Sequence, residues 1–212
     1  MIQLLALVAA LNGTWSIAPS PNAGEVHLTL TAYGTAGTSL NQDGSDVSVT
    51  SLGLSRQDLT APGHHVTFTI ARDAGDFQCD GWIDKGRGGG TLTFSPSPAY
   101  RSEMGSLGYH VTPEQQLGAA MLDVSFAYAK EMTSLGLGKI EFHNLMAFRA
   151  LGIDPQYVRD LASVGYIHLT SRQVVELRAL KIDAAYIRKV EAHGYDHPPV
   201  GDLVRLKAMN II

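Results

Sequence analysis

The histidine pair His193 and His197 is the place where residue spacing comes nearest to a metal site. The two residues lie four positions apart, and on one continuous helix this spacing would bring both imidazoles to a zinc ion. Gly194 lies between them, and a glycine there is typical of the left-handed residue that ends a helix. The two imidazoles then face different ways, so the sequence predicts no metal centre here.

Other motifs favour a structural interpretation over a chemical one. Cys79 is the only cysteine, which excludes a disulfide within the chain and favours a buried, inert thiol. The run Gly86–Gly90 lacks the Gly-Lys-Ser/Thr ending of a phosphate-binding loop, so we expect a hairpin. Asn41–Asp46 lacks the spacing of a calcium loop, so we expect a solvated turn. His64 and His65 begin an expected strand and should lie on its opposite faces.

Neither motifs nor charge indicate catalysis or nucleic-acid binding. No nucleophile, base and orienting acid stand at a motif-like spacing, so we expect a non-enzymatic protein without a cofactor. The net charge is −4, made up of −5 for residues 1–139 and +1 for the remainder. Because neither part has the basic excess that a phosphate backbone requires, we expect no nucleic-acid partner.

The residues from 12 to 96 alternate between apolar and polar positions. Val26, Leu28 and Leu30 share one parity, and the same period of two recurs around Val47, around Phe68 and in three further places up to Phe94. This period indicates strands with one buried face, separated by Gly-, Pro- and Asp-containing turns. About six strands in some 85 residues predict a small antiparallel β-barrel or sandwich.

The residues from 97 to 212 predict an α-helical repeat array. The tyrosines Tyr100, Tyr128, Tyr157 and Tyr186 each begin a similar decapeptide, and they lie 28, 29 and 29 residues apart. This spacing gives a period of about 29 residues, within the range of helical repeats. The fold class is therefore α+β, with a segment at 1–11, a β-domain at 12–96 and a repeat domain at 97–212.

Each predicted repeat contains signals for the beginning and end of a helix. Three residues before each leading tyrosine stands an N-cap residue, and eight residues after it stands a glycine suited to the left-handed helix end. Thr112-Pro113-Glu114-Gln115 predicts the capping box of a second helix in the period. The N-cap residues are Ser97, Ser125, Asp154 and Asp183, and the glycines are Gly108, Gly136, Gly165 and Gly194.

The apolar run Met1–Ala10 is too short for a bilayer, which takes about 20 residues. No Lys or Arg precedes it, and the first basic residue is Arg56. Either a secretory signal truncated at its start or an N-terminal element packed on the body fits this pattern. No other segment of the sequence is apolar for long enough to form an integral membrane span.

Ile153–Arg159, following Phe148–Gly152, resembles repeated units found in one bacterial family. These units follow the peptidase part of some antirepressor-type (beta-lactam-sensor-like) zinc metallopeptidases. Asn12–Trp15, Gly86–Gly90 and Phe94–Tyr100 resemble the same proteins. The peptidase half is absent, because the chain has no His-Glu-x-x-His motif. The resemblance implies a bacterial, periplasmic or secreted module without proteolytic activity.

The function that we expect is a non-catalytic protein-interaction module of the bacterial cell envelope. Another protein would be the partner, with a second copy of the chain as an alternative. The second hypothesis is a protein that binds a small apolar ligand in the β-domain interior or in a cleft between domains. The candidate binding residues under these two hypotheses are Arg149, Arg159, Arg178 and Arg188 for a partner, and Trp15 and Trp82 for a ligand.

Overall fold

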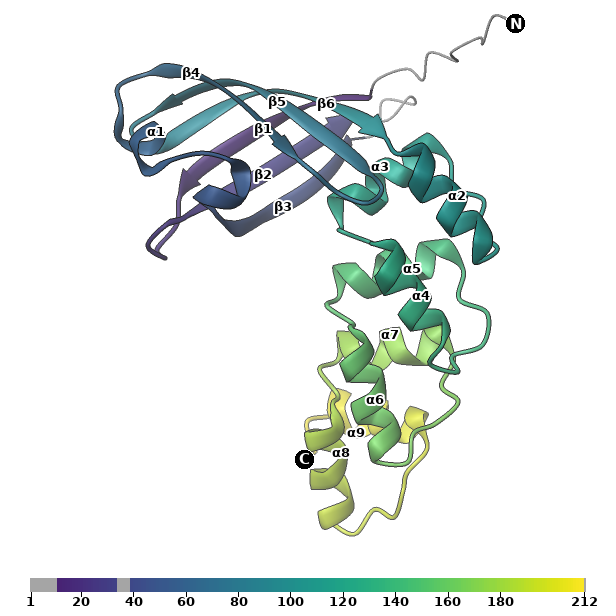
Figure 1. The fold of residues 1–212 in the computed structure, drawn as a ribbon. Coiled ribbons are helices and arrows are strands. Elements are labelled where there is room, and N and C mark those ends of the chain that lie inside the picture. The colour runs from purple at the N-terminus through teal and green to yellow at the C-terminus, as the bar shows by residue number, and fades with distance from the viewer. Residues whose placement is uncertain (1–10, 34–38, 212) are drawn as a thin grey trace, which may run out of the picture. The chain divides into compact units, whose positions relative to one another are not determined.

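The structure is a computed structural model that describes residues 11–33 and 39–211, without the side chains of 39–43. The expected apolar segment at 1–11 lies outside the described residues, apart from Leu11. The fold is α+β, as predicted, with a six-stranded antiparallel sheet followed by helices (Figure 1). The chain forms two compact units. The first takes the chain up to Ser106 together with His110–Ser125, and the second takes Leu107–Tyr109 and Phe126–Ile212.

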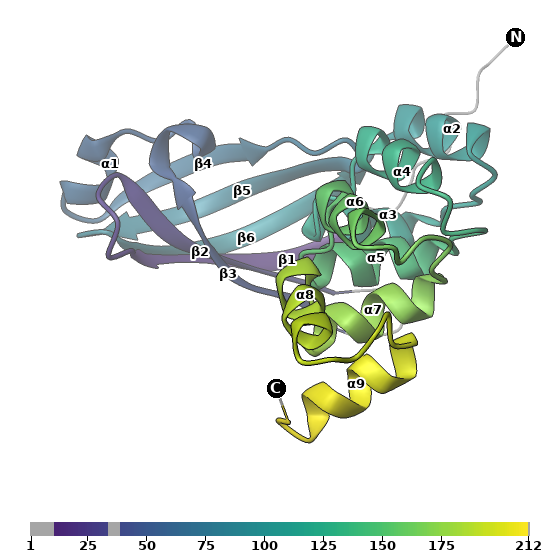
Figure 2. The same ribbon diagram turned by 90° about the horizontal axis from the view of Figure 1, so that it is seen from below.

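The sheet of the first unit has the strand order β3-β2-β1-β6-β5-β4 (Figure 2). Strands that follow each other in the chain pair with each other, except β3 and β4, and β1 also pairs with β6. Among the described residues β3 and β4 do not pair, so the sheet is not closed and a barrel is not confirmed. The strands are β1 (Leu11–Pro19), β2 (Glu25–Tyr33), β3 (Ser39–Ser48), β4 (His64–Ile70), β5 (Gly75–Asp84) and β6 (Arg87–Pro96).

One face of the sheet is packed with the side chains that the sequence alternation selects. Trp15 is 2% exposed; its ring meets Phe68 edge-on at 4.9 Å between centroids, and its Nε1 donates to the carbonyl of Asp80 at 3.2 Å. Glycine is required beside it, because a Cβ on Gly81 would lie 2.8 Å from the indole and 2.4 Å from a backbone oxygen of β6. The inward residues therefore form the core of this unit.

Two turn predictions have different outcomes. The expected hairpin at Gly86–Gly90 is confirmed, because β5 and β6 join through Lys85 and Gly86, both with positive φ. The expected turn at Asn41–Asp46 is wrong, since β3 runs through it. The pairing of β2 with β3 shifts register between Leu28 and Leu30, so the Asp-Gly signal marks a β-bulge instead of a chain reversal.

A short segment lies between the edge strands β3 and β4. The 3-10 helix η1 (Val49–Leu52) contacts both strands, and buries Val49 and Leu52. The helix α1 (Arg56–Thr60) follows and begins with a capping box between Ser55 and Asp58. This segment covers apolar side chains where the two edge strands do not meet.

The helices α2 (Pro98–Ser106) and α3 (Pro113–Met121) belong to the same compact unit as the sheet. Gln116 explains why, because its fully buried amide Nε2 donates to the carbonyls of Ala74 at 3.1 Å and Ser97 at 2.7 Å. Its Oε1 accepts from the guanidinium of Arg101 at 3.1 and 3.3 Å. The sequence predicts a boundary at residue 97, whereas the first compact unit extends to Ser125.

The second unit contains three successive helix pairs. Within it α4 contacts α6 and α6 contacts α8, while α5 contacts α7 and α7 contacts α9. The first helices of the pairs begin at residues 126, 155 and 184, and the second helices begin at 142, 171 and 200. The helices are α4 (Phe126–Thr133), α5 (Phe142–Ala150), α6 (Pro155–Ser163), α7 (Ser171–Ala179), α8 (Ala184–Ala192) and α9 (Val200–Ala208).

Helix ends follow the predicted caps. Asp154 and Asp183 accept from the backbone N–H groups of Tyr157 and Tyr186, and Ser97 does the same for Tyr100. The predicted capping box at Thr112 is also confirmed. All four predicted glycines, from Gly108 to Gly194, have φ between 75° and 91°. These positions satisfy backbone groups that a short helix leaves unpaired.

Tyrosine hydroxyls connect the helices to carbonyl groups further along the chain. Tyr128 donates to Ile153 at 2.7 Å and Tyr157 donates to Ile182 at 2.6 Å, both over 25 residues. In the first unit Tyr100 donates to Val124 at 2.9 Å. Burial raises the pKa of the Tyr100, Tyr128 and Tyr157 hydroxyls well above the ordinary value, so they remain neutral donors.

Candidate functional site

The helical unit has an apolar hollow of about 240 Å³ beside α6. Ile167 lines this hollow and is 61% exposed, which makes it one of the most exposed large apolar side chains among the described residues. Two loops form the walls, one after α4 and the other after α6, where left-handed glycines at 136 and 165 reverse the chain. The apolar lining comes from Leu135, Leu137, Val158, Ala162, Ile167 and Leu169.

The aromatic floor of this region is chemically inert at neutral pH. Tyr166 lines the hollow and donates its hydroxyl to the carbonyl of Pro198. Burial raises its pKa to about 12, and the ring of His197 packs against it with 4.6 Å between centroids. The hollow therefore presents hydrocarbon and aromatic surface, which suits contact with an apolar side chain of a partner.

Arg149 and Arg178 are part of the helix packing. Their guanidinium carbons lie 5.0 and 4.9 Å from the ring centroids of Tyr128 and Tyr157. The Nε of Arg178 also donates to the carbonyl of Leu151 at 3.1 Å, at the end of α5. Stacking on a ring and capping a helix end both stabilise the fold, so these two cations already have structural roles.

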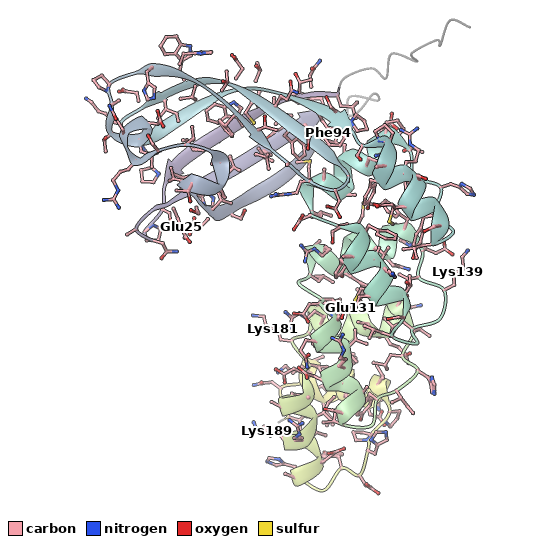
Figure 3. All side chains as sticks on the ribbon, in the orientation of Figure 1. Glu25, Phe94, Glu131, Lys139, Lys181 and Lys189 are labelled. Atoms are coloured by element: carbon pink, nitrogen blue, oxygen red, sulfur yellow. The ribbon has the colours of Figure 1, made fainter. Side chains whose placement is uncertain are left out.

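Arg159 and Arg188 lie on α6 and α8 and have different surroundings. Arg159 forms an ion pair with Glu131 of α4, which Figure 3 labels. Arg188 is exposed and makes no hydrogen bond or ion pair with any described residue. The structure thus brings the four predicted arginines onto the helical unit, and leaves Arg188 as the one whose cation is free among residues 11–33 and 39–211.

The two tryptophans lie on opposite faces of the sheet. Trp15 is in the packed core, whereas Trp82 is 60% exposed on the outer face. The ring of His65 meets Trp82 edge-on at 5.7 Å. The structure does not bring the two indoles together at one cavity. The alternation of residues along β5 predicts this outcome, because Phe77, Cys79 and Ile83 lie on one face and Trp82, with the opposite parity, lies on the other.

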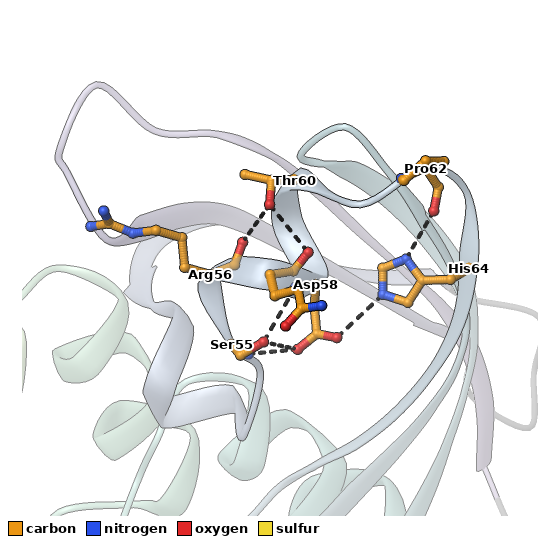
Figure 4. A network of polar contacts seen from close by, with 7 residues as sticks. Ser55, Arg56, Asp58, Thr60, Pro62 and His64 are labelled. Atoms are coloured by element: carbon orange, nitrogen blue, oxygen red, sulfur yellow. Dashed lines mark hydrogen bonds and ion pairs between the residues drawn. The ribbon is translucent and has the colours of Figure 1, made fainter.

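Ser55, Asp58 and His64 form a network that resembles a catalytic triad in composition (Figure 4). The carboxylate of Asp58 lies in the middle, accepting from the Ser55 hydroxyl at 2.6 Å and contacting His64 Nε2 at 3.3 Å. His64 Nδ1 contacts the carbonyl of Pro62 at 3.2 Å. A nucleophilic serine needs the histidine next to its hydroxyl, so this order of groups serves helix capping and the turn before β4.

The remaining candidate residues, one cysteine and two histidines, are buried or make contacts within the fold. Cys79 is buried as predicted, and burial raises the pKa of its thiol to about 12. His193 Nδ1 contacts the carbonyl of Lys189 at 2.8 Å, and His197 packs on Tyr166. Within the described part of the chain, no three His, Cys, Asp or Glu side chains are placed to hold a metal ion.

Comparison with other proteins gives no relative for this fold. No family model matches the chain, and no curated protein or solved structure matches it. The resemblance to the segments that follow bacterial antirepressor-type peptidases therefore stays a prediction. No helix among the described residues is long and apolar enough to cross a membrane.

Sequence reasoning did not identify the hollow at Ile167. The available signal is a large apolar residue directly after the Gly-Tyr pair that ends α6, at a point where the chain has left the helix. The corresponding residues after α4 and α8 are Gly138 and Asp196, so the apolar side chain occurs at only one of three equivalent places. The site is therefore indicated by the difference between the helix pairs at this position and not by the sequence pattern that they share.

Proposed function

We propose that this protein is a non-catalytic protein-interaction module and that the hollow at Ile167 is its docking point. The observation that carries the proposal is the combination of an exposed isoleucine with an apolar hollow of about 240 Å³. Interfaces between proteins place aliphatic and aromatic side chains in such depressions and surround them with polar residues. A partner of this chemistry would insert an apolar side chain between Leu137 and Leu169.

We infer that the second part of the chain is a tandem repeat with a unit of about 29 residues. Three features support this period. Helix starts are separated by 29 residues within the second unit, and left-handed residues recur at 123, 152, 181 and 210. Cations also stack on tyrosines at 149, 178 and 207. Repeat arrays of this kind offer an extended surface on which one unit can differ from its neighbours.

For the first unit, we infer that the sheet is an incomplete up-and-down barrel. Its strand order would close into a ring if β3 paired with β4, and η1 contacts both of these strands. The inward side chains fill the interior, as in small barrels. This filling favours a partner on the surface over a small apolar ligand in the interior.

The compartment that we propose is the bacterial cell envelope, either the periplasm or the outside of the cell. Support comes from the resemblance of the repeats to extracytoplasmic segments of the peptidase family. Sequencing of the mature N-terminus in the native organism tests it: a start at Leu11 agrees with secretion, and retention of Met1 contradicts cleavage.

Site-specific photo-crosslinking in native cells tests the docking point. A photoreactive residue at position 167 is expected to capture a partner, and the Ile167→Asp variant of the same chain is expected to lose this partner on co-purification. A photoreactive residue at Tyr33, an exposed aromatic residue of β2, is the matched control. Capture at both positions alike, or at neither, contradicts the proposal, while capture of a second copy identifies the partner as the chain itself.

A further inference from the structure

The outer face of β4, β5 and β6 carries a regular grid of polar side chains. Pairing aligns Thr69, Gln78 and Thr93 in one row. The next row is Thr67, Asp80 and Thr91, and the third is His65, Trp82 and Gly89. All nine positions have outward parity, opposite to the buried residues of the same strands. The grid offers hydroxyl, amide and carboxylate groups and contains neither Lys nor Arg.

Trp82 is the only large apolar side chain of this grid. Its cross-strand neighbour on β6 is Gly89, which has no side chain to cover the indole. On the β4 side the ring of His65 meets it at an interplanar angle of 70°, and this edge contact restricts the orientation of the indole. Much of the indole is therefore open to solvent, since Trp82 is 60% exposed.

Polar groups surround a shallow hollow over the first two rows of the grid, and Trp82 lies in the row that follows. The hollow has a volume of about 340 Å³, and its lining includes Thr67, Thr69, Gln78, Asp80 and Thr93. His65 Nε2 contacts one carboxylate oxygen of Asp80 at 3.1 Å. The other oxygen makes no hydrogen bond or ion pair with any residue that the structure describes. A fixed carboxylate with one free oxygen accepts two hydroxyl donors in a defined geometry.

We propose that this face binds a neutral carbohydrate chain. A pyranose ring has one face of C–H groups, which stack on the electron-rich face of an indole, and a rim of hydroxyls, which both donate and accept. Hydroxyl, amide and carboxylate groups in rows beside one open aromatic ring match both features. The nine positions contain no Lys or Arg, and Arg87, in the row next to that of Trp82, lies opposite the carboxylate residue Asp84, so the grid offers little attraction to phosphorylated or acidic ligands. This inference concerns the first unit and does not depend on the docking point at Ile167.

Fluorescence titration of the full chain tests this proposal, because the chain has only two tryptophans and Trp15 is buried. The probes are cellohexaose, chitohexaose, xylohexaose and maltohexaose. We expect at least one to change the emission saturably, with a Kd between about 10 μM and 1 mM. Calorimetry with the same sugar gives a second measurement that does not depend on the indole.

Variants of the grid residues distinguish a specific carbohydrate site from non-specific binding. Trp82→Ala is expected to weaken binding about tenfold or more, and Trp82→Phe by less. Asp80→Asn keeps the shape of the grid and is expected to weaken binding about threefold to tenfold. Met209→Ala, which removes an equally exposed apolar side chain from the helical unit, should leave binding unchanged.

Two results would overturn the proposal. One is the absence of saturable binding to any of the four sugars at 10 mM (a concentration about ten times the weakest Kd expected), with the thermal unfolding of the protein normal. The other is binding that Trp82→Ala leaves intact. If no sugar binds while crosslinking at position 82 captures a protein, the exposed indole is a protein contact and the carbohydrate assignment is wrong.

Discussion

The fully buried side-chain amide of Gln116 donates a hydrogen bond to the carbonyl oxygen of Ser97 over 2.7 Å. Ser97 directly follows β6, and Gln116 is in the middle of α3. The same Nε2 reaches Ala74 in the turn before β5. One buried amide thus joins the first helix pair to two different strands, and explains why these helices belong with the sheet.

Replacement of Gln116 by Leu is expected to destabilise the first unit by about 2–4 kcal/mol. The variant removes two hydrogen bonds to backbone carbonyls, each worth about 0.5–1.5 kcal/mol, and the oxygen that accepts from the Arg101 guanidinium, worth about 1.5–3 kcal/mol, while the buried leucine side chain offsets part of this loss. Urea unfolding followed by the fluorescence of the core indole Trp15 measures this loss. Gln57→Leu, at an exposed position of α1, is the matched control and should change the unfolding free energy by less than about 0.5 kcal/mol. Equal effects of the two variants would contradict a structural role for the buried amide.

The same Tyr→Phe substitution is expected to change the stability of the helical unit differently at different tyrosines. Tyr128→Phe and Tyr157→Phe remove a hydroxyl that has a carbonyl partner, so each should cost about 1–2 kcal/mol. The hydroxyl of Tyr186 is buried without a hydrogen-bond partner among the described residues, so Tyr186→Phe should be neutral or stabilising by up to about 1 kcal/mol. Chemical denaturation followed by far-UV circular dichroism gives the three values. A loss at Tyr186 as large as at the other two would contradict the hydrogen-bond explanation.

Lys181→Gly is expected to stabilise the helical unit by about 0.5–1 kcal/mol. Lys181 has φ = 55° at the end of α7, whereas the equivalent residue after α5 is Gly152 with φ = 63°. A left-handed conformation costs a residue with a Cβ about 1 kcal/mol relative to glycine. Lys189→Gly is the control, because this residue lies inside α8 (Figure 3) and the change should cost about 1 kcal/mol there. Thermal unfolding of the two variants should shift in opposite directions.

Acid should weaken the cap of α1. The Ser55 hydroxyl, followed by its backbone N–H, lowers the pKa of Asp58 from its ordinary value. A folded-state pKa below the unfolded one means that the stabilisation is present above the unfolded value, near pH 4, and is lost as pH falls through the folded value. The stability difference between the wild type and Ser55→Ala should therefore be largest near neutral pH and shrink below about pH 4.

Urea midpoints measured between pH 2.5 and 7 test this pH dependence. Ser51→Ala is the control, because the Ser51 hydroxyl donates to a backbone carbonyl and not to a carboxylate. Its effect should not change with pH over this range. A Ser55→Ala effect that stays constant with pH would show that the charge of Asp58 does not contribute.

Local features of the fold could be predicted from the sequence, because they depend on residues close together in the chain. The inward parity of Val26, Leu28 and Leu30, the N-caps Asp154 and Asp183, and the left-handed glycines are of this kind. Each requires only a period or a spacing of a few residues. The division of the sheet into inner and outer faces follows from the same parity.

Features that join distant residues could not be predicted. The contact between Gln116 and Ala74 spans 42 residues, and a glutamine on a helix is exposed in most proteins. The stacking of Arg149 on Tyr128 joins two helices, whereas the sequence suggested an arginine free for a partner. The hollow at Ile167 depends on how two loops pack together. These relations depend on tertiary packing, which no local pattern encodes.

The tyrosine hydrogen bonds have a direction, and this matters for synthesis of the chain. Tyr128 and Tyr157 each donate to a carbonyl 25 residues later, so a ribosome produces every donor well before its acceptor. A nascent helix therefore keeps an unpaired hydroxyl until the following helix has been translated. Folding of the helical unit should then advance from the N-terminal end in steps of one helix pair, and a translational pause inside a pair would leave the most recent tyrosine exposed to water.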